Sequence, residues 1–151
     1  MAVLFLSCNA GGNKKPNAGS GTPVKTQVSA PSFDADSAYA YVAQQVAFGP
    51  RVPNTPEHAA CASWLASELE RHGAEVTVQE GRERAFDGTI LNMKNIVGTF
   101  HPESRDRILL FAHWDTRPFA DKDTVRLREP IDGANDGASG VGVLQEIARQ
   151  L

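Results

Sequence analysis

The 151-residue sequence has few of the features that would identify a class of function at once. Its only cysteines are Cys8 and Cys61, so we expect neither a disulfide framework nor a zinc site built from cysteines. It contains no apolar run long enough to span a bilayer and no internal repeat. The net charge of −3 comes without a basic stripe, which argues against a nucleic-acid partner. The hydrophobic content of 41% is ordinary for a globular chain.

The amino-terminal part divides into two segments that differ from the rest in composition. Residues 1–8 form a short apolar run that resembles the end of a bacterial lipoprotein signal segment, in which Cys8 would be lipidated. A frayed apolar terminus stays open as the alternative, because the run lacks a basic start. Residues 9–31 have no hydrophobic periodicity and are rich in Gly, Asn, Ser and Pro, which predicts a disordered linker. The lipoprotein interpretation implies membrane anchoring through Cys8 and a bacterial periplasmic or membrane-anchored location.

Hydrophobic spacing predicts an α/β arrangement for residues 32–151. The expected elements are helices over 33–48 and 56–72, strands over 74–80, 90–100 and 107–112, a charged hairpin region over 81–88, and a helix through 141–151. The third strand is the most apolar, so we expect it to be the most central. Cys61 is expected to be a buried small residue. The histidines expected to be surface or capping residues are His58, His72 and His101.

The most informative stretch runs from residue 108 to residue 151. The apolar run Ile108–Ala112 ends in His113-Trp-Asp115, which is typical of a buried strand that presents polar side chains at its carboxyl end. Ligands bind at that edge in open α/β sheets. The Gly-rich turn Asp132–Gly140 then leads into helical spacing and places Asp136 at the start of a helix. A carboxylate there faces free backbone N–H groups, stays ionised and can bind a cation.

Each of these residues also has an ordinary structural interpretation. His113 alone would be a hydrogen-bonded histidine, and Asp136 alone would be a helix cap. Asp115 alone would be a turn residue, and Trp114 alone would be a packing residue. The conjunction of a His-x-Asp pair at a strand end with a Gly-Ala-Asn-Asp-Gly turn before a helix favours a metal site. In such a site Asp115 would hold the tautomer of His113.

These motifs resemble the zinc-dependent M28 aminopeptidase family and its glutaminyl cyclase branch. The family resemblance rests on residues 113–115 and 132–140. The branch resemblance rests on the longer run 113–121 and on Phe48-Gly-Pro-Arg-Val-Pro-Asn-Thr55, which are similar to bacterial glutaminyl-peptide cyclotransferases. The resemblance extends from about Ala38 to Leu151. It implies a mixed β-sheet flanked by helices, the three-layer zinc aminopeptidase-like fold, present here as an incomplete amino-terminal portion.

The resemblance also implies a reaction and a cofactor. The family branch converts the N-terminal glutamine of peptides and proteins to pyroglutamate and releases ammonia. One Zn²⁺ would be held by Asp136 together with a Glu and a His that lie outside these 151 residues. His113 would bind a second zinc only in the two-zinc aminopeptidase alternative. Trp114 and Phe119 flank the His-x-Asp corner and are candidate walls of the substrate pocket.

The catalytic glutamate pair of the family has no counterpart in the sequence, because Gln145-Glu146 lies in the middle of a predicted helix. We therefore expect the chain alone to be inactive and to fold poorly, with an unpaired sheet edge and an incomplete core. Three functions stay open. They are the cyclase, which is an acyltransferase, a two-zinc aminopeptidase, and a non-catalytic lipoprotein fragment.

Overall fold

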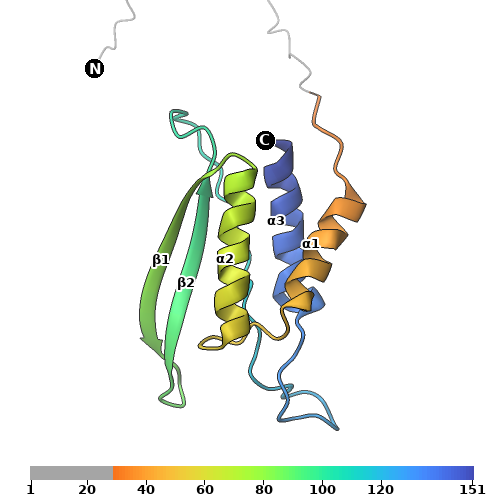
Figure 1. Ribbon diagram of the computed structural model, residues 1–151, viewed down its shortest axis with the longest axis vertical. Coiled ribbons are helices and arrows are strands. Elements are labelled where there is room, and N and C mark those ends of the chain that lie inside the picture. Colours follow the sequence, from red (N-terminus) through yellow and green to blue (C-terminus); the bar gives the residue numbers. More distant parts are fainter. Residues whose placement is uncertain (1–28) are drawn as a thin grey trace, which may run out of the picture. The chain divides into compact units, whose positions relative to one another are not determined.

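The structure, a computed structural model, describes residues 29–151, and residues 31–151 form one compact unit (Figure 1). Its elements in chain order are α1 (Ala35–Ala47), α2 (Pro56–Arg71), β1 (Glu75–Arg84), β2 (Ile90–Thr99), the short turn η1 (Ala134–Ala138) and α3 (Ser139–Gln150). Within the described part, no helix combines the length and apolar character that crossing a membrane requires. The predictions for residues 1–8 and for most of 9–31, including lipidation of Cys8, lie outside the described residues and stay predictions.

The first two helices begin at residues whose side chains cap the helix start. The carboxylate of Asp34 accepts hydrogen bonds from the backbone N–H groups of Asp36 and Ser37, both at 3.0 Å. The hydroxyl of Thr55 accepts from the N–H of His58 at 3.2 Å, and a proline occupies the first position of α2. These contacts satisfy N–H groups that have no partner inside the helix. The starts of α1 and α2 are therefore fixed by local chemistry.

The two strands form an antiparallel hairpin whose register runs from Glu75 opposite Thr99 to Arg84 opposite Ile90. The first strand is longer than predicted, because the charged residues after Glu80 continue the strand instead of forming a loop. Both faces of this end are largely exposed, so charged side chains are tolerated there, and Glu80 pairs with Lys94 directly opposite it. The predicted charged hairpin region is thus mostly strand, with a tight turn after Arg84.

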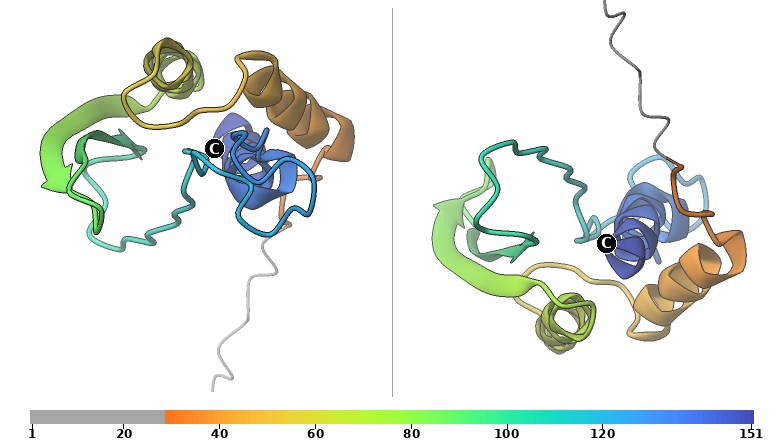
Figure 2. Two further views of the ribbon diagram at one scale, coloured as in Figure 1. Left: turned by 90° about the horizontal axis from the view of Figure 1, so that it is seen from below. Right: turned by 90° about the horizontal axis from the view of Figure 1, so that it is seen from above.

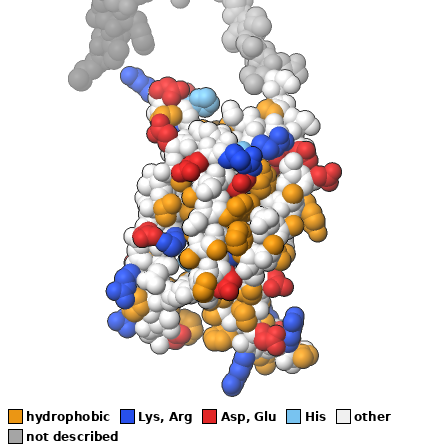
Figure 3. Space-filling model, viewed as in Figure 1, with side chains coloured by type: hydrophobic (Ala, Val, Ile, Leu, Met, Phe, Trp, Pro, Cys, Tyr) orange, Lys and Arg blue, Asp and Glu red, His pale blue; other side chains and the backbone are white. Residues whose placement is uncertain are grey.

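The core lies where α2 packs between the hairpin and α3. Hydrophobic side chains gather along the middle of this face in Figure 3, where Figure 1 places α2 and α3. The buried cluster consists of Cys61, Ala62, Leu65, Trp114 and Val141. The buried position predicted for Cys61 is confirmed. Burial raises the pKa of the Cys61 thiol to about 11, so this thiol stays protonated at neutral pH.

Helix α1 is fastened to α3 by Glu146, whose side chain is completely buried. Its carboxylate accepts a hydrogen bond from the backbone N–H of Asp34 at 3.0 Å and from the guanidinium of Arg149 at 2.7 and 2.9 Å. The hydrogen bonds from Arg149 lower the pKa of Glu146 to about 2, and those from Gln150 and the Asp34 N–H act in the same direction. Glu146 is therefore occupied in holding two helices together, in agreement with its exclusion from the catalytic pair.

The prediction of a third, central strand over 107–112 is wrong for this structure. The segment is an extended connection between the hairpin and α3, and no other strand of the described residues pairs with it (Figure 2). Ile108 is 89% exposed and Phe111 is 85% exposed. A strand is defined by the ladder of hydrogen bonds to its neighbours. An apolar run with no neighbouring strand therefore does not form a regular strand, although its composition is that of one.

Replacing Phe111 with lysine should leave the free energy of unfolding almost unchanged, because the ring contributes little buried area. The same change should reduce the binding of a hydrophobic dye and any self-association measured by light scattering. Leu65→Ala is the contrasting core variant, and it should cost about 2–5 kcal/mol in urea unfolding followed by circular dichroism. A loss of comparable size in Phe111→Lys would mean that the segment is packed in solution.

Candidate active site

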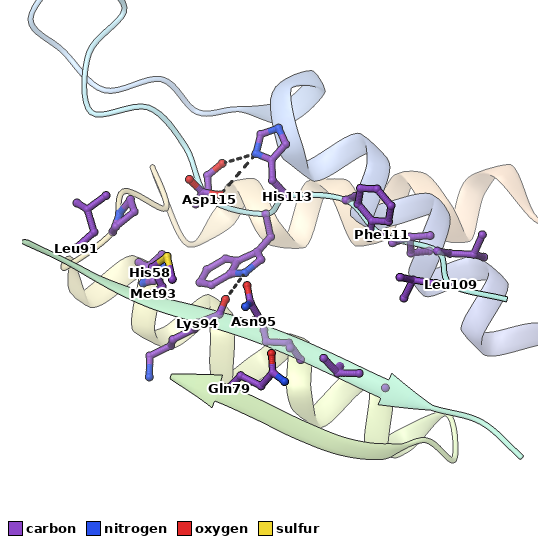
Figure 4. Close-up of a pocket in the computed structure, with 18 residues that line it drawn as sticks. His58, Gln79, Leu91, Met93, Lys94, Asn95, Leu109, Phe111, His113 and Asp115 are labelled. Carbon is purple, nitrogen blue, oxygen red and sulfur yellow. Dashed lines mark hydrogen bonds and ion pairs between the residues drawn. The ribbon is translucent and has the colours of Figure 1, made fainter. Parts of the chain in front are cut away.

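His113 and Asp136 are 23 positions apart in the sequence and lie against each other. The Nε2 atom of His113 is 3.2 Å from Oδ1 of Asp136. Its Nδ1 atom is 3.1 Å from the backbone oxygen of Asp115 and 3.6 Å from the carboxylate of the same residue (Figure 4). A hydrogen bond from Nδ1–H to the Asp115 carbonyl fixes the tautomer, so the lone pair of Nε2 faces the Asp136 carboxylate.

Two acceptor atoms this close repel each other unless a cation lies between or beside them. The Nε2 lone pair and the Asp136 oxygen can share a proton, or they can share a metal ion. Two ligands of a tetrahedral zinc with bonds of about 2.0–2.1 Å lie about 3.3 Å apart, close to the 3.2 Å observed. Both side chains are about half exposed, so a metal ion has access to them. The donor types and the spacing of this pair fit zinc.

The Gly-rich turn brings Asp136 to this position because two of its residues have no side chain. Gly133 has a φ of +60°, and a Cβ atom there would lie 2.4 Å from Cγ2 of Thr116. Gly137 has a φ of +102°, and a Cβ atom there would lie 3.1 Å from Cε1 of His113. The backbone of Asp136 itself leaves helical geometry, with φ −85° and ψ 92°. Only glycine permits both the conformation and the close approach.

The partners of Asp136 differ from the expected ones. The sequence predicts a carboxylate that faces the free N–H groups of a helix start. In the described residues its neighbours are instead the His113 ring and the guanidinium of Arg117, whose Nε is 3.5 Å from Oδ2. Because the turn kinks at Asp136 and Gly137, the carboxylate belongs to the turn and not to the first turn of α3. Its charge is therefore offset by side chains from the loop after the His-x-Asp corner.

A buried arginine joins the two segments that carry the candidate site. Arg51 is completely buried, and its Nε donates to the backbone oxygen of Trp114 at 3.3 Å. Its Nη1 donates to the carbonyl of Asp132 and its Nη2 to the carbonyl of Gly133, the latter at 3.0 Å. The carbonyl of Arg51 accepts from the N–H of Thr116 at 3.0 Å. Burial lowers the pKa of Arg51, and the nearby Asp132 and Asp115 act in the opposite direction.

Trp114 forms the floor beneath the His-x-Asp corner. Its ring is buried and stacks on His58, with centroids 4.2 Å apart and planes inclined by 21°. Its indole N–H donates to the backbone oxygen of Lys94 in β2 at 3.2 Å. The prediction that His58 is a surface or capping residue is wrong, because the ring is only 4% exposed. Burial lowers the pKa of His58, so the imidazole is held neutral beside the indole.

A cavity of about 540 Å³ opens beside this floor. It lies between β2 and the segment 109–115, and Figure 4 shows His113 and Asp115 at one side of it with Met93 and Lys94 opposite. Trp114 lines the cavity. Phe119, the second predicted pocket wall, is 54% exposed in the loop and is not among the lining residues. Of the other histidines, His72 caps α2 as predicted and His101 is exposed.

The described residues do not form a complete metal site. Within residues 29–151, no group of three or more His, Cys, Asp or Glu side chains is arranged to hold a metal ion. His113 and Asp136 provide two possible ligand atoms, and Asp115 lies against the other ring nitrogen of His113. Catalytic zinc commonly has three protein ligands and one open position. A zinc ion held by this pair would therefore need at least one further ligand.

Comparison with known proteins agrees with this partial site. Residues 95–151 match the model of peptidase family M28. The chain is 63% identical to a solved glutaminyl cyclase from Tannerella forsythia, with a TM-score of 0.78 over 80% of this chain and 42% of that one. It is 61% identical to a glutaminyl cyclase from Bacteroides thetaiotaomicron, with a TM-score of 0.78 over 80% of this chain and 42% of that one. Curated protein sequences gave no match.

A third solved structure is a Zn-dependent exopeptidase from Parabacteroides distasonis, which is 61% identical with a TM-score of 0.78 over 81% of this chain and 42% of that one. The chain therefore belongs to peptidase family M28, and its fold is an incomplete portion of the zinc exopeptidase-like α/β fold. Within that family it is similar to the bacterial glutaminyl cyclases, and it fits an amino-terminal portion of them. The chain spans about 42% of the length of these structures.

The role of Arg51 is the main feature of the site that sequence reasoning missed. The contacts of Arg51 are with the backbone, and they reach both halves of the site. The sequence signal that could have indicated this role is a lone arginine between Gly-Pro and Val-Pro. His58 was missed for a different reason, because only the tertiary structure places its ring under Trp114.

Replacing His58 with phenylalanine should make the free energy of unfolding less dependent on pH. In the folded protein burial holds the pKa of His58 below its usual value of about 6.5, so below that pH the unfolded chain binds more protons. Stability conferred by the neutral ring is thus present above pH 6.5 and is lost as the pH falls. Phenylalanine keeps the stack on Trp114 and removes the titration.

The measurement is urea unfolding of both proteins between pH 7.5 and pH 5. The decline in stability toward low pH should be shallower in His58→Phe than in the unsubstituted protein. Leu65→Ala serves as the control, because it removes packing without removing a titrating group and should shift the whole curve. Parallel curves for His58→Phe and the unsubstituted protein would contradict a neutral, buried His58.

Proposed function

We propose that residues 32–151 form the amino-terminal part of a zinc-dependent glutaminyl-peptide cyclotransferase. The observation that carries this proposal is the 3.2 Å approach of His113 Nε2 to Asp136 Oδ1, where His113 also lines a cavity of about 540 Å³. The similarity to bacterial glutaminyl cyclases selects this reaction among those that the M28 fold supports. The substrates would be peptides or proteins that begin with glutamine.

Asp136 is the residue of this chain that would hold the single zinc of the cyclase, together with ligands from outside the described residues. When bound, zinc would polarise the γ-amide carbonyl of the substrate glutamine. His113 would become a second ligand residue only if the site holds two zinc ions, as in the aminopeptidase alternative. Nε of Arg117 lies 3.5 Å from Oδ2 of Asp136, and Oδ1 faces His113.

The reaction joins two atoms of the same residue. The α-amine nitrogen attacks the δ-carbon of the glutamine side chain, the bond from that carbon to the amide nitrogen breaks, and ammonia leaves with the proton that the amine gives up. The pocket must hold the glutamine in a folded-back conformer, because proximity supplies much of the rate of an intramolecular reaction. A glutamate from outside the described residues would carry the proton.

The residues of this chain would shape the pocket that holds this conformer and would exclude water from it. Trp114 forms a rigid apolar floor, since its ring is fixed by the stack on His58 and by the hydrogen bond to Lys94. Asp115 holds the His113 ring through its backbone carbonyl. Excluding water below the reacting groups strengthens every electrostatic contact above the floor.

We further propose that the protein acts outside the cytoplasm, as a periplasmic or membrane-anchored lipoprotein attached through Cys8. Support comes from the sequence of residues 1–8 and from the linker composition of 9–31. Labelling with a radioactive or alkyne-bearing fatty acid, in cells that express the protein with Cys8 or with Cys8→Ala, separates this from a plain apolar terminus.

The activity is best tested in a chimera in which residues 32–151 replace the matching part of the Tannerella forsythia cyclase. Incubation with zinc and a peptide that begins with glutamine should give a product that has lost one ammonia, as measured by mass spectrometry. Asp136→Asn should lower the rate by about 100-fold or more, since it removes a metal ligand and not only a supporting contact. The exposed Asp106→Asn is the matched control and should keep the activity.

Other products would point to the alternatives. Loss of the whole first residue would mean an aminopeptidase and would make His113 a candidate second-zinc ligand. Neither product, in a chimera that folds and binds zinc, would leave the non-catalytic interpretation. The 151-residue chain assayed alone should be inactive, because its described residues hold no group of three or more possible metal ligands, and a catalytic zinc commonly has three.

A further inference from the structure

Arg51 makes five hydrogen bonds that all go to the backbone, and four of them reach the two segments that carry the candidate site. From the guanidinium these run to Trp114, Asp132 and Gly133, and the carbonyl of Arg51 accepts from Thr116. The fifth runs from Nη1 to Gly49 at 3.2 Å. We propose that Arg51 is a positioning residue that sets the distance between His113 and Asp136. That these two residues bind a metal rests on the proposed function, but their positioning by Arg51 does not.

The contacts of Arg51 bracket the His-x-Asp corner on one side. Trp114 precedes Asp115 and Thr116 follows it, and both are bound to Arg51 through their main chains. With both neighbours fixed, the carbonyl of Asp115 has little freedom, and that carbonyl accepts the hydrogen bond from His113 Nδ1. The orientation of the His113 ring is therefore tied to Arg51 by two successive hydrogen bonds.

The same guanidinium fixes the turn on the other side. The carbonyl of Gly133 accepts from Nη2 of Arg51 and also from the N–H of Ala138 at 3.2 Å. This second bond closes the loop of backbone that contains Asp136. The carboxylate of Asp136 is thus carried on a turn whose first and last residues meet at an atom that Arg51 holds. A shift of the Arg51 guanidinium would move His113 and Asp136 independently and would change the distance between them.

Arginine is the residue type that this junction requires. Among the described residues Arg51 forms no ion pair, so carbonyl dipoles offset its buried charge. The planar fork directs Nε, Nη1 and Nη2 to separate acceptors on two segments at once. A lysine has one nitrogen at the end of a flexible chain and cannot span the same carbonyls. Because Arg51 is completely buried, it contacts no substrate and acts through the residues that it holds.

The test compares Arg51→Lys with the exposed control Arg126→Lys in the full 151-residue protein. The first readout is the tautomer of His113, obtained from long-range proton–nitrogen correlations in NMR spectra without metal. The unsubstituted protein and Arg126→Lys should show one tautomer, with the proton on Nδ1. Arg51→Lys should keep its helix content by circular dichroism and show a mixture of both tautomers. A single Nδ1–H tautomer in folded Arg51→Lys would overturn the proposal.

The second readout is the affinity for Zn²⁺ alone, measured by calorimetry in the chimera with the Tannerella forsythia cyclase, which would supply the remaining ligands, at a temperature where all proteins are folded. Arg51→Lys should bind zinc about 10-fold more weakly, as expected when support behind a ligand is lost. A residue that only stabilises the fold would lower the unfolding temperature and leave both the tautomer and the affinity unchanged, which would also overturn the proposal. Absence of zinc binding in the unsubstituted chimera would count against the proposed function only, since the tautomer readout needs no metal.

A measurement on the unsubstituted protein decides the matter if Arg51→Lys does not fold. Scalar couplings across hydrogen bonds report which carbonyl carbons accept from the guanidinium of Arg51. Couplings to Trp114 and to either Asp132 or Gly133 would support the proposal, because they show one side chain holding both segments. Couplings to a single segment would overturn it, because a side chain attached to one segment cannot set a distance between two.

Discussion

The stack of His58 on Trp114 is the contact on which the arrangement of the folded unit depends. The indole ring of Trp114 belongs to the buried cluster with Cys61 and Leu65. It stacks on His58 of α2, and its N–H donates a hydrogen bond to β2. The residues on either side of it, His113 and Asp115, are exposed enough to meet a ligand. Core and candidate site are consequently not separate regions, and any movement of α2 is transmitted to the His-x-Asp corner.

The charges around that corner form a second constraint. A buried guanidinium is neutralised by carbonyl groups, while an ionised carboxylate and an imidazole lone pair face each other at 3.2 Å. The arrangement is favourable only when positive charge is supplied near Asp136, by Arg117, by a proton on His113 or by a metal ion. The electrostatics of the turn are therefore those of a site that is completed by a cation.

Local chemistry made much of this predictable, and tertiary contacts account for what was not. The helices near 33–48 and 56–72 and the Gly-rich turn that carries Asp136 depend on neighbours in sequence, so the local pattern predicted them. The burial of His58 and the contacts of Arg51 depend on residues more than 50 positions away, which no local pattern encodes. The apolar run over 107–112 has the composition of a strand, but strand structure also requires a neighbouring backbone.

The buried thiol of Cys61 has a practical consequence for following the protein in solution. It lies at the centre of the core cluster with no exposed surface, and its pKa of about 11 leaves almost no thiolate at neutral pH. Alkylating reagents attack the thiolate, so modification of Cys61 must wait until α2 separates from Trp114 and Val141. The rate at which Cys61 is alkylated therefore reports the opening of the core.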